Sequence, residues 1–567
     1  MDSQQENDQR INQRINFYKP QPTKDDYFDQ RQNFATKIRR DNKNSVIHRK
    51  RLNGISAENL IHIKEISNVD MSSSGSLQHN MIIINGQSQD PDQHIQVLQL
   101  LQKLMQPEQI VEGIAQDKKK DLLYLRELRQ ALIAHQDELT FHQFILKGGI
   151  KVLTSYIIDS KTNQQSKEEA IWALTNLSIF SGSYEADFME ACEALLHILH
   201  SDKIDNLGSL LNLKQQCLKT LGNLAIDSEK MRHQIANFNG NGLKTIIDLI
   251  YFNRAPLTEQ CFWTLNNFLI ADFQYNQLCI QQGLCKAINN TIDKVQVKSE
   301  DLLSEMLWCL HYLIRNEEQV AQFVCEQIPN LHKKLAAELE SSVSITSNIV
   351  RPIINILGNI IPLRLEYGHD LMYDEKFQTF ILTILFQPDD QNLYKKECLW
   401  VLSNILAGPS EHNFEFILEN KNLLEQIIHI ASSQDYQVKK EALVTLYNLC
   451  ENHQNRYLQK VMSKNPSQAF FQVLQNYFTC DPYLLKVSIS FCSLICEKYP
   501  EQAIKLIQQE NISEMIENIQ YKYEQNPELV QLSSSFLEKY IYNISHDAVV
   551  DESSMHDTNN EKMSFNI

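Results

Sequence analysis

The 567-residue sequence is poor in the two residues that interrupt helices, with 15 glycines and 14 prolines. This scarcity argues against an all-β protein, which needs many tight turns. The sequence has no run of about 18 apolar residues, so we expect no membrane-spanning helix and no membrane insertion. The opening stretch MDSQQENDQRINQ is polar and lacks the apolar core of a secretory signal peptide.

The sequence also lacks the short motifs of common enzymes. It contains no GxxxxGK[ST] phosphate loop, no HExxH zinc pattern and no GxSxG nucleophile elbow. The 17 histidines are scattered, and the neighbouring acids Glu168 and Glu169 suit a solvated helix face better than an acid–base pair. We therefore expect no enzymatic activity, no cofactor and no metal.

The 12 cysteines include no CxxC pair. Most of them lie inside apolar helical patterns, as Cys261, Cys309 and Cys398 do. We interpret them as reduced core residues of a cytosolic or nuclear protein.

Charge is unevenly distributed along the chain, whose formal net charge is −17. Residues 1–53 carry 12 Lys/Arg and 7 Asp/Glu, whereas the rest carries 41 and 63. A basic arm on an acidic body suggests that the body prefers cationic partners. The arm then binds either a separate acidic partner or the body itself. Alternatively, the net negative charge of the body only keeps the protein soluble and has no role in choosing a partner.

Composition divides the chain into five parts. Residues 1–25 are polar and expected to be disordered, and residues 26–54 form a basic segment that could fold on binding. Residues 55–93 are a linker containing SNVDMSSSGSLQHN. Apolar residues then recur at helical spacing over 94–545, and 546–567 form an acidic tail that we also expect to be disordered.

The helical region repeats with a fixed period. All 4 tryptophans precede a polar residue by four positions: Trp172 and Asn176, Trp263 and Asn267, Trp308 and Tyr312, Trp400 and Asn404. With Asn223, Asn359 and Asn448, these polar residues are 44 to 47 residues apart. Gln130 and Ser493 extend the series to about nine or ten units. This period predicts an all-α solenoid of the armadillo or HEAT type.

Six of the seven anchored units also have an acid or amide three positions before the tryptophan or the residue in its place. These residues are Glu169, Gln216, Gln260, Glu305, Glu397 and Glu441. Offsets of three and four place all three residues of a unit on one helical face. A single Trp–Asn pair is most simply explained as core, but a whole row of amides, acids and indoles is poor core material. We therefore predict an exposed ladder on the inner surface of the solenoid.

Such a ladder suits an extended basic peptide. An asparagine amide can bond both the N–H and the C=O of a passing backbone. Indole rings can pack on the methylene stem of a Lys or Arg and attract its charge, which contributes about 0.5–2 kcal/mol per contact. The acids Glu169, Asp227, Glu397 and Glu441 would favour cations further.

Seven segments mark successive repeats: WALTNLS, LGNLAIDS, WTLNN, WCLHYL, NILGNI, KKECLWVLSNILAG and VKKEALVTLYNL. In order and in spacing, these segments resemble the armadillo repeats of the importin alpha adaptors. The resemblance covers about residues 26–545. It implies a right-handed superhelical armadillo solenoid of about nine or ten repeats, with a flexible basic N-terminal segment.

The resemblance also implies two binding sites for nuclear localisation signals. The major site would comprise Trp172, Asn176, Gln216, Asn223, Asp227, Trp263 and Asn267. The minor site would comprise Trp308, Tyr312, Asn359, Glu397, Trp400, Asn404, Glu441 and Asn448. Asp227 matches the family's acid that pairs with the key lysine of the signal.

Three positions depart from the family pattern. Lys219 and Val444 stand where tryptophans are expected, and Asn355 replaces an arginine. Because Lys219 removes an indole and adds a charge like that of the ligand, we expect a weaker or altered major site. The minor site need not be subordinate to it.

The segment ATKIRRDNKNSVIHRKRLNG (35–54) resembles the family's importin-beta-binding segment. Its matching basic residues are Arg39, Arg40, Lys43, Arg49, Lys50 and Arg51. The stretch HRKR also resembles a localisation signal, and its tether would let it compete with cargo for the ladder. A solvated tail or a nucleic-acid arm is the alternative. The segment lacks the aromatic interleaving that stacks on bases, and an acidic body repels nucleic acid.

These features favour an adaptor that binds the Lys/Arg-rich signals of cargo and links them to importin beta. The family resemblance implies shuttling between cytoplasm and nucleus, with an export receptor gripping the C-terminal repeats. The lack of aromatic interleaving in the basic segment and the acidic body lead us to expect no direct binding of nucleic acid. The alternative is an armadillo scaffold of cell junctions or the cytoskeleton, in which the groove would be basic rather than acidic.

Overall fold

The computed structural model describes residue 99 and residues 117–542, apart from 135–137, 202–206, 295–298, 316, 342–347, 389–393, 409–410, 421, 434 and 452–454. The predicted disordered N-terminus, basic segment, linker and acidic tail lie outside the described residues, and so does the start of the predicted solenoid. Those boundaries stay predictions.

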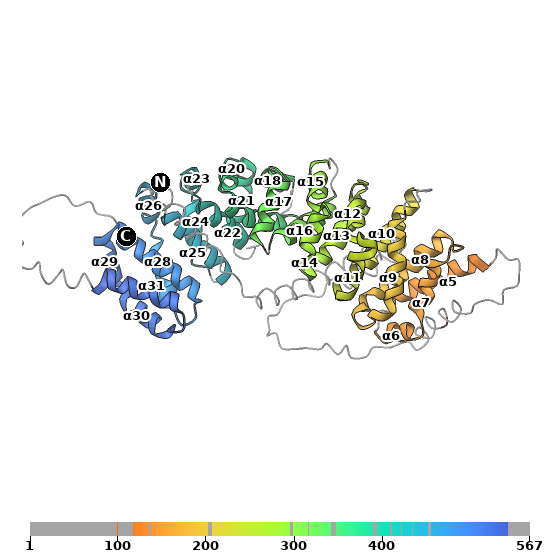
Figure 1. Cartoon of the computed structure of the whole chain (residues 1–567). Helices are drawn as coiled ribbons and strands as arrows, with labels where there is room; N and C mark the ends of the chain where they lie inside the picture. Colours follow the sequence, from red (N-terminus) through yellow and green to blue (C-terminus); the bar gives the residue numbers. More distant parts are fainter. Residues whose placement is uncertain are drawn as a thin grey trace, which may run out of the picture. The chain divides into compact units, whose positions relative to one another are not determined.

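The described residues form helices and no strand, so the all-α prediction is confirmed. The described chain forms two compact units, and the boundary between them falls between residues 287 and 288. Figure 1 shows the helices of each unit in chain order, coloured from orange to blue. No helix in the described ranges is both long and apolar enough to cross a membrane.

The N-terminal unit contains α5 to α14 and the start of α15. Its helices are α5 (Asp117–Ala134), α6 (Glu138–Leu146), α7 (Gly149–Ile158), α8 (Gln164–Leu177), η2 (Ser178–Ser183), α9 (Glu185–His200), α10 (Leu207–Asp227), α11 (Glu229–Asn237), η3 (Phe238–Gly240), α12 (Gly242–Ile250), α13 (Ala255–Ala271), α14 (Gln274–Gln281) and α15 (Leu284–Lys294).

The C-terminal unit contains the end of α15 and all later helices. These are α16 (Glu300–Ile314), α17 (Glu318–Gln327), α18 (Leu331–Ser341), α19 (Val350–Ile360), η4 (Ile361–Leu363), α20 (Leu365–Met372), α21 (Glu375–Leu385), α22 (Lys395–Leu406), α23 (Glu411–Glu419), α24 (Leu423–Ile430), α25 (Tyr436–Glu451), α26 (Asn455–Met462), α27 (Ser467–Gln475), α28 (Pro482–Lys498), α29 (Pro500–Gln509), α30 (Ile512–Lys522), α31 (Pro527–Leu537) and η6 (Glu538–Tyr542).

One helix of each repeat stands at the position of the Trp–Asn pattern, and within each unit these helices stack on one another. In the N-terminal unit α5 packs on α8, α8 on α10 and α10 on α13. In the C-terminal unit the same stacking runs through α16, α19, α22, α25, α28 and α31. These ten helices in the described residues agree with the predicted nine or ten repeats. The architecture is that of an armadillo-type solenoid.

Stacking buries the apolar stripe of each of these helices. Leu174, Leu221 and Leu265 are fully buried, and they lie two residues before their anchor asparagines. An isolated repeat would expose this stripe, so neighbouring repeats supply the core. Cys261, Cys309 and Cys398 are also buried, as predicted from their apolar surroundings.

Asparagine takes over a role that glycine usually plays in the turns. Six non-glycine residues with positive φ are asparagines: Asn239, Asn253, Asn330, Asn422, Asn465 and Asn511. Asparagine tolerates the left-handed region because its short side chain bonds locally. This explains how a glycine-poor chain makes so many sharp turns between helices.

Candidate functional site

Four of the anchor asparagines are hydrogen-bonded to the preceding repeat, whereas Asn359 donates to the Asn355 carbonyl of its own helix. The donor in the four is the side-chain nitrogen Nδ2: Asn223 donates to Ser178 Oγ (2.9 Å), Asn267 to the Gly222 carbonyl (3.1 Å), Asn404 to the Gly358 carbonyl (2.8 Å) and Asn448 to the Ser403 carbonyl (3.1 Å). Three of these acceptors directly precede the asparagine of their own repeat. The stacking therefore fixes the orientation of each amide.

We call this arrangement the ladder and divide it by unit. The N-terminal ladder comprises Glu169, Trp172, Asn176, Gln216, Lys219, Asn223, Trp263 and Asn267, on α8, α10 and α13. The C-terminal ladder comprises Trp308, Tyr312, Asn359, Glu397, Trp400, Asn404, Glu441 and Asn448, on α16, α19, α22 and α25.

The prediction of an exposed ladder is wrong for several of the polar side chains. Asn267, Asn404 and Asn448 are only 7%, 3% and 6% exposed, and Tyr312 is 2% exposed. Burial is tolerated because each of these amides has a backbone partner in the preceding repeat. The sequence predicted that these residues share one helical face. It did not show the hydrogen bonds between repeats that allow their side chains to be buried.

The ladder nevertheless holds polar atoms without a partner. None of the described residues offers a hydrogen bond to Asn176 Nδ2, Gln216 Oε1 or Asn404 Oδ1, although all three atoms are buried. An unsatisfied buried polar group costs about 1–3 kcal/mol. Two acceptors and one donor on this face therefore lack a partner within the described residues.

The tryptophans are half-buried, neither fully exposed nor packed away inside the core. Trp263 and Trp400 lie against glycines of the preceding repeat. A Cβ atom added to Gly222 would come within 2.3 Å of the Trp263 ring, and one added to Gly358 within 2.0 Å of the Trp400 ring. The same glycine thus seats the indole and accepts the asparagine bond of the next repeat.

Replacing Gly358 by alanine is expected to destabilise the C-terminal unit by about 1–3 kcal/mol, because the new methyl group overpacks against the Trp400 ring. Thermal denaturation and tryptophan fluorescence would measure the loss and the displacement of the indole. Gly368→Ala is the matched control, since its Cβ would meet only Ile405 and Ile361 at 3.3 Å or more. Equal stability of G358A and G368A would contradict the role of Gly358 as a seat.

Tyr312 takes the place of an asparagine and forms an aromatic cluster. Its ring stacks on Trp308 at a centroid distance of 5.7 Å, and the Arg315 guanidinium lies 4.7 Å above the Tyr312 ring. His311 meets the Trp308 ring edge-on at 5.5 Å. Burial, reinforced by Arg315, lowers the pKa of His311 to about 3, so this imidazole is neutral at pH 7.

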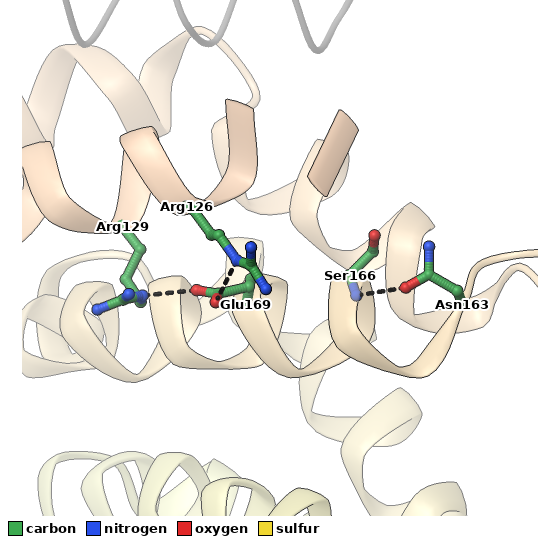
Figure 2. A network of polar contacts seen from close by, with 5 residues as sticks. All are labelled: Arg126, Arg129, Asn163, Ser166 and Glu169. Atoms are coloured by element: carbon green, nitrogen blue, oxygen red, sulfur yellow. Dashed lines mark hydrogen bonds and ion pairs between the residues drawn. The ribbon is translucent and has the colours of Figure 1, made fainter. Parts of the chain in front are cut away.

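The charge of Glu169 is not available to a ligand in the way that the sequence suggested. Figure 2 shows Arg126 and Arg129 of α5 converging on this carboxylate. The Nε atoms of Arg126 and Arg129 lie 3.3 Å and 2.6 Å from its oxygens. The Arg129 guanidinium also lies 4.1 Å above the Trp172 ring. The expectation that Glu169 favours ligand cations is therefore corrected, because the preceding repeat supplies the cations.

The acids of the C-terminal ladder are less fully neutralised. Glu397 lies 3.8 Å from Arg351, at the outer limit of an ion pair. The pKa of Glu441 is raised to about 7, mainly by burial; Lys440 and Lys396 oppose this shift, and the neighbouring Glu397 adds to it. A cation placed beside Glu397 and Glu441 would meet two carboxyl groups.

The structure places the predicted site residues of each unit on stacked helices, but it does not describe every one of them. The side chain of Asp227, the last residue of α10, lies outside the described part. The same holds for the whole basic segment with Arg39, Arg40, Lys43, Arg49, Lys50 and Arg51. Their predicted roles remain predictions. Lys219 is half-buried and Val444 is buried at the positions where tryptophan was expected from the sequence.

Sequence reasoning missed the two glycine seats and the two arginines of α5. The glycines had a signal, since LGNL (221–224) and LGNI (357–360) both place glycine directly before the anchor. The sequence signal for Arg126 was weaker. Arg126 stands four residues before Gln130, which is the position that tryptophan takes in several later repeats.

Comparison with known proteins agrees with this architecture. No family model matches the chain. Importin subunit alpha-9 of Arabidopsis thaliana is 22% identical over 438 residues, which is 74% of this chain and 79% of that protein. Importin subunit alpha-2 of Oryza sativa subsp. japonica is 22% identical over 443 residues, 74% of this chain and 78% of that protein.

A solved engineered protein shares the fold, with a TM-score of 0.60 and 16% identity over 78% of this chain and 98% of its own. Its likeness supports the helical architecture alone. The repeat period, the stacked helices and the two curated matches agree with one another. Together they support a relationship to the importin alpha family, at modest identity to the relatives it matches.

Proposed function

We propose that this chain is an adaptor of nuclear transport. It binds extended, Lys/Arg-rich nuclear localisation signals of cargo along the ladder, and it binds importin beta through residues 26–54. The observation that carries the proposal is the set of buried, unpartnered polar atoms beside partly exposed indoles on one face of stacked helices. Kinship to importin alpha, a family of adaptors and not of enzymes, supports it.

Backbone recognition follows from the chemistry of the amides. Asn404 and Asn448 have each committed one N–H to the preceding repeat, which leaves a second N–H and the carbonyl oxygen of each amide for a ligand. Asn404 Oδ1 is a buried acceptor of this kind, and Asn176 Nδ2 is a buried donor. Such groups bind a peptide backbone without regard to its side chains.

Side-chain preference comes from the indoles and acids. Trp400 lies between Glu397 and Asn404 on α22, and Glu441 lies on the adjacent α25. A Lys stem packed on this indole brings its ammonium group towards the two carboxyl groups. In the N-terminal ladder, by contrast, Glu169 is paired with two arginines and Lys219 adds a further cation. We infer that the C-terminal ladder is the stronger site for basic signals.

The basic segment supplies the link to transport. In this proposal HRKR (48–51) competes with cargo for the ladder until importin beta removes it, and an export receptor later grips the C-terminal repeats. The protein accordingly shuttles between cytoplasm and nucleus.

A structural scaffold is the second candidate function. The cations Arg126, Arg129 and Lys219 favour it to a limited extent, because a basic lining suits acidic or amphipathic partners. The carboxyl groups of the C-terminal ladder argue for the adaptor.

The deciding experiment is a pull-down of importin beta by the full chain and by the chain lacking residues 1–54. We expect capture by the full chain only. We also expect the shortened chain to bind a Lys-rich cargo peptide more tightly in titration calorimetry, since the tethered competitor is gone. No capture of importin beta by either chain would rule out the adaptor. Unchanged peptide affinity would rule out the competition.

A further inference from the structure

We propose that Arg126 and Arg129 form a carboxylate-binding corner where the N-terminal ladder begins. The ligand is the carboxylate of an acidic residue beside the basic run of a bound peptide, or the carboxylate at the end of that peptide. This inference rests on the proposed function, because it concerns a peptide already lying along the ladder.

The two guanidinium groups are held in place by their contacts with α8. Their Nε atoms engage opposite oxygens of Glu169, at 3.3 Å for Arg126 and 2.6 Å for Arg129 (Figure 2). Arg129 is also fixed over the Trp172 ring, at 4.1 Å. The start of α8 is fixed as well, since Asn163 Oδ1 accepts a hydrogen bond from the Ser166 amide at 2.9 Å. A preorganised pair loses little side-chain freedom when a ligand binds.

The corner keeps most of its donors and an excess of positive charge. A guanidinium carries five N–H donors, and only the Nε donor of each arginine is bonded within the described residues. The terminal nitrogens remain, and two parallel N–H donors match the geometry of a carboxylate. One carboxylate faces two guanidiniums, which leaves a net charge of about +1.

Accessibility differs between the two arginines in a way that suits binding. The Arg126 side chain is 47% exposed, whereas the Arg129 side chain is 15% exposed. Arg126 can thus meet a ligand at the surface while Arg129 anchors the cluster. Asn176, two turns beyond Glu169 on α8, adds the unpartnered Nδ2 donor to the same face. Donors therefore extend from the corner into the ladder, where a peptide offers carbonyl oxygens.

The test compares three forms of one Lys-rich peptide. One carries Gln beside the basic run and an amidated end, the second carries Glu at that position and an amidated end, and the third carries Gln and a free terminal carboxylate. Each is titrated into the full chain with Asn404→Ala and Asn448→Ala, so that the C-terminal ladder does not mask the signal. We expect the Glu form or the free-carboxylate form to bind at least about fivefold tighter than the Gln amide, and the stronger of the two identifies the source of the carboxylate.

Arg126→Gln should abolish this preference and leave the affinity for the Gln amide within about twofold. Lys244→Gln is the matched control, because it removes the same charge from an exposed pair with Asp248 on α12. K244Q should keep the preference. Thermal denaturation checks that both variants are folded. The comparison of the three peptides also tests the corner in a chain that keeps Arg126, so the test does not depend on the R126Q variant.

The outcomes separate this inference from the proposed function. Equal affinity for all three peptides would overturn the corner alone, and so would binding that disappears only in the N404A/N448A chain. Failure of every peptide to bind the unsubstituted chain would overturn the proposed function instead. A preference that persists in R126Q would assign the effect to another residue and also refute the corner.

Discussion

Replacing Asn404 and Asn448 together by alanine is expected to weaken binding of a Lys-rich peptide about 30-fold or more. Each amide contributes hydrogen bonds to the peptide backbone, and each such bond has a net value of about 0.5–1.5 kcal/mol. Titration calorimetry with the chain lacking residues 1–54 measures the loss directly. The corresponding pair in the N-terminal ladder, Asn176→Ala with Asn267→Ala, should cost only about three- to fivefold, because Lys219 and the paired Glu169 already weaken that site.

The control for this experiment must separate ligand binding from repeat stacking. Asn448 also donates to the Ser403 carbonyl, so its loss removes an inter-repeat bond. Thr445 Oγ1 makes a comparable bond to the Leu399 carbonyl at 3.1 Å and is fully buried. Thr445→Val therefore removes one stacking bond without changing the peptide face. A similar loss of affinity in T445V and in the double variant would attribute the effect to stacking and contradict the ladder.

Binding to the C-terminal ladder is expected to strengthen about tenfold between pH 6 and pH 8. Burial holds the pKa of Glu441 at about 7, so its carboxyl group is mostly neutral at pH 6 and charged at pH 8. A lysine bound beside it favours the charged form, and binding at pH 7 should release a fraction of a proton. Calorimetry in buffers of different ionisation enthalpy detects this release. Glu441→Gln should bind with little dependence on pH over this range.

The same group affects stability in the opposite direction. The pKa of Glu441 is higher in the folded chain than its usual value of 4.5, so the folded state holds the extra proton between about pH 4.5 and pH 7. Stability therefore falls as pH rises through this window. E441Q should be more stable than the unsubstituted chain at pH 8, by an amount on the order of 1–3 kcal/mol, and about equally stable at pH 4. If the unsubstituted chain is as stable as E441Q at pH 8, Glu441 is not desolvated.

The repeat could be predicted from sequence because its period is a spacing between residues along the chain. The spacing of Asn223, Asn267, Asn404 and Asn448 gave the period, and the structure confirms that these residues lie on stacked helices. Their burial could not be predicted in the same way. Whether an amide is exposed depends on its backbone partner about 45 residues earlier in the chain, and no local pattern shows that partner.

The arginine corner was missed for a related reason. Arg126 and Arg129 lie on α5, whose repeat lacks the tryptophan that marked the later ones. Their contact with Glu169 spans about 40 residues and depends on how α5 stacks on α8. The acid was recognised from its position, but its neutralisation became apparent only from the packing.

The central claim, that a basic peptide lies along the stacked ladder helices, is tested most directly by photo-crosslinking. A Lys-rich peptide with a photoreactive group in the middle of its basic run would be irradiated with the full chain in excess importin beta, and the modified residues mapped by mass spectrometry. We predict crosslinks on α19, α22 and α25, near Trp400 and Glu441, with fewer on α8, α10 and α13. Crosslinks concentrated instead on α21 and α24, which carry none of the ladder residues, would contradict the account.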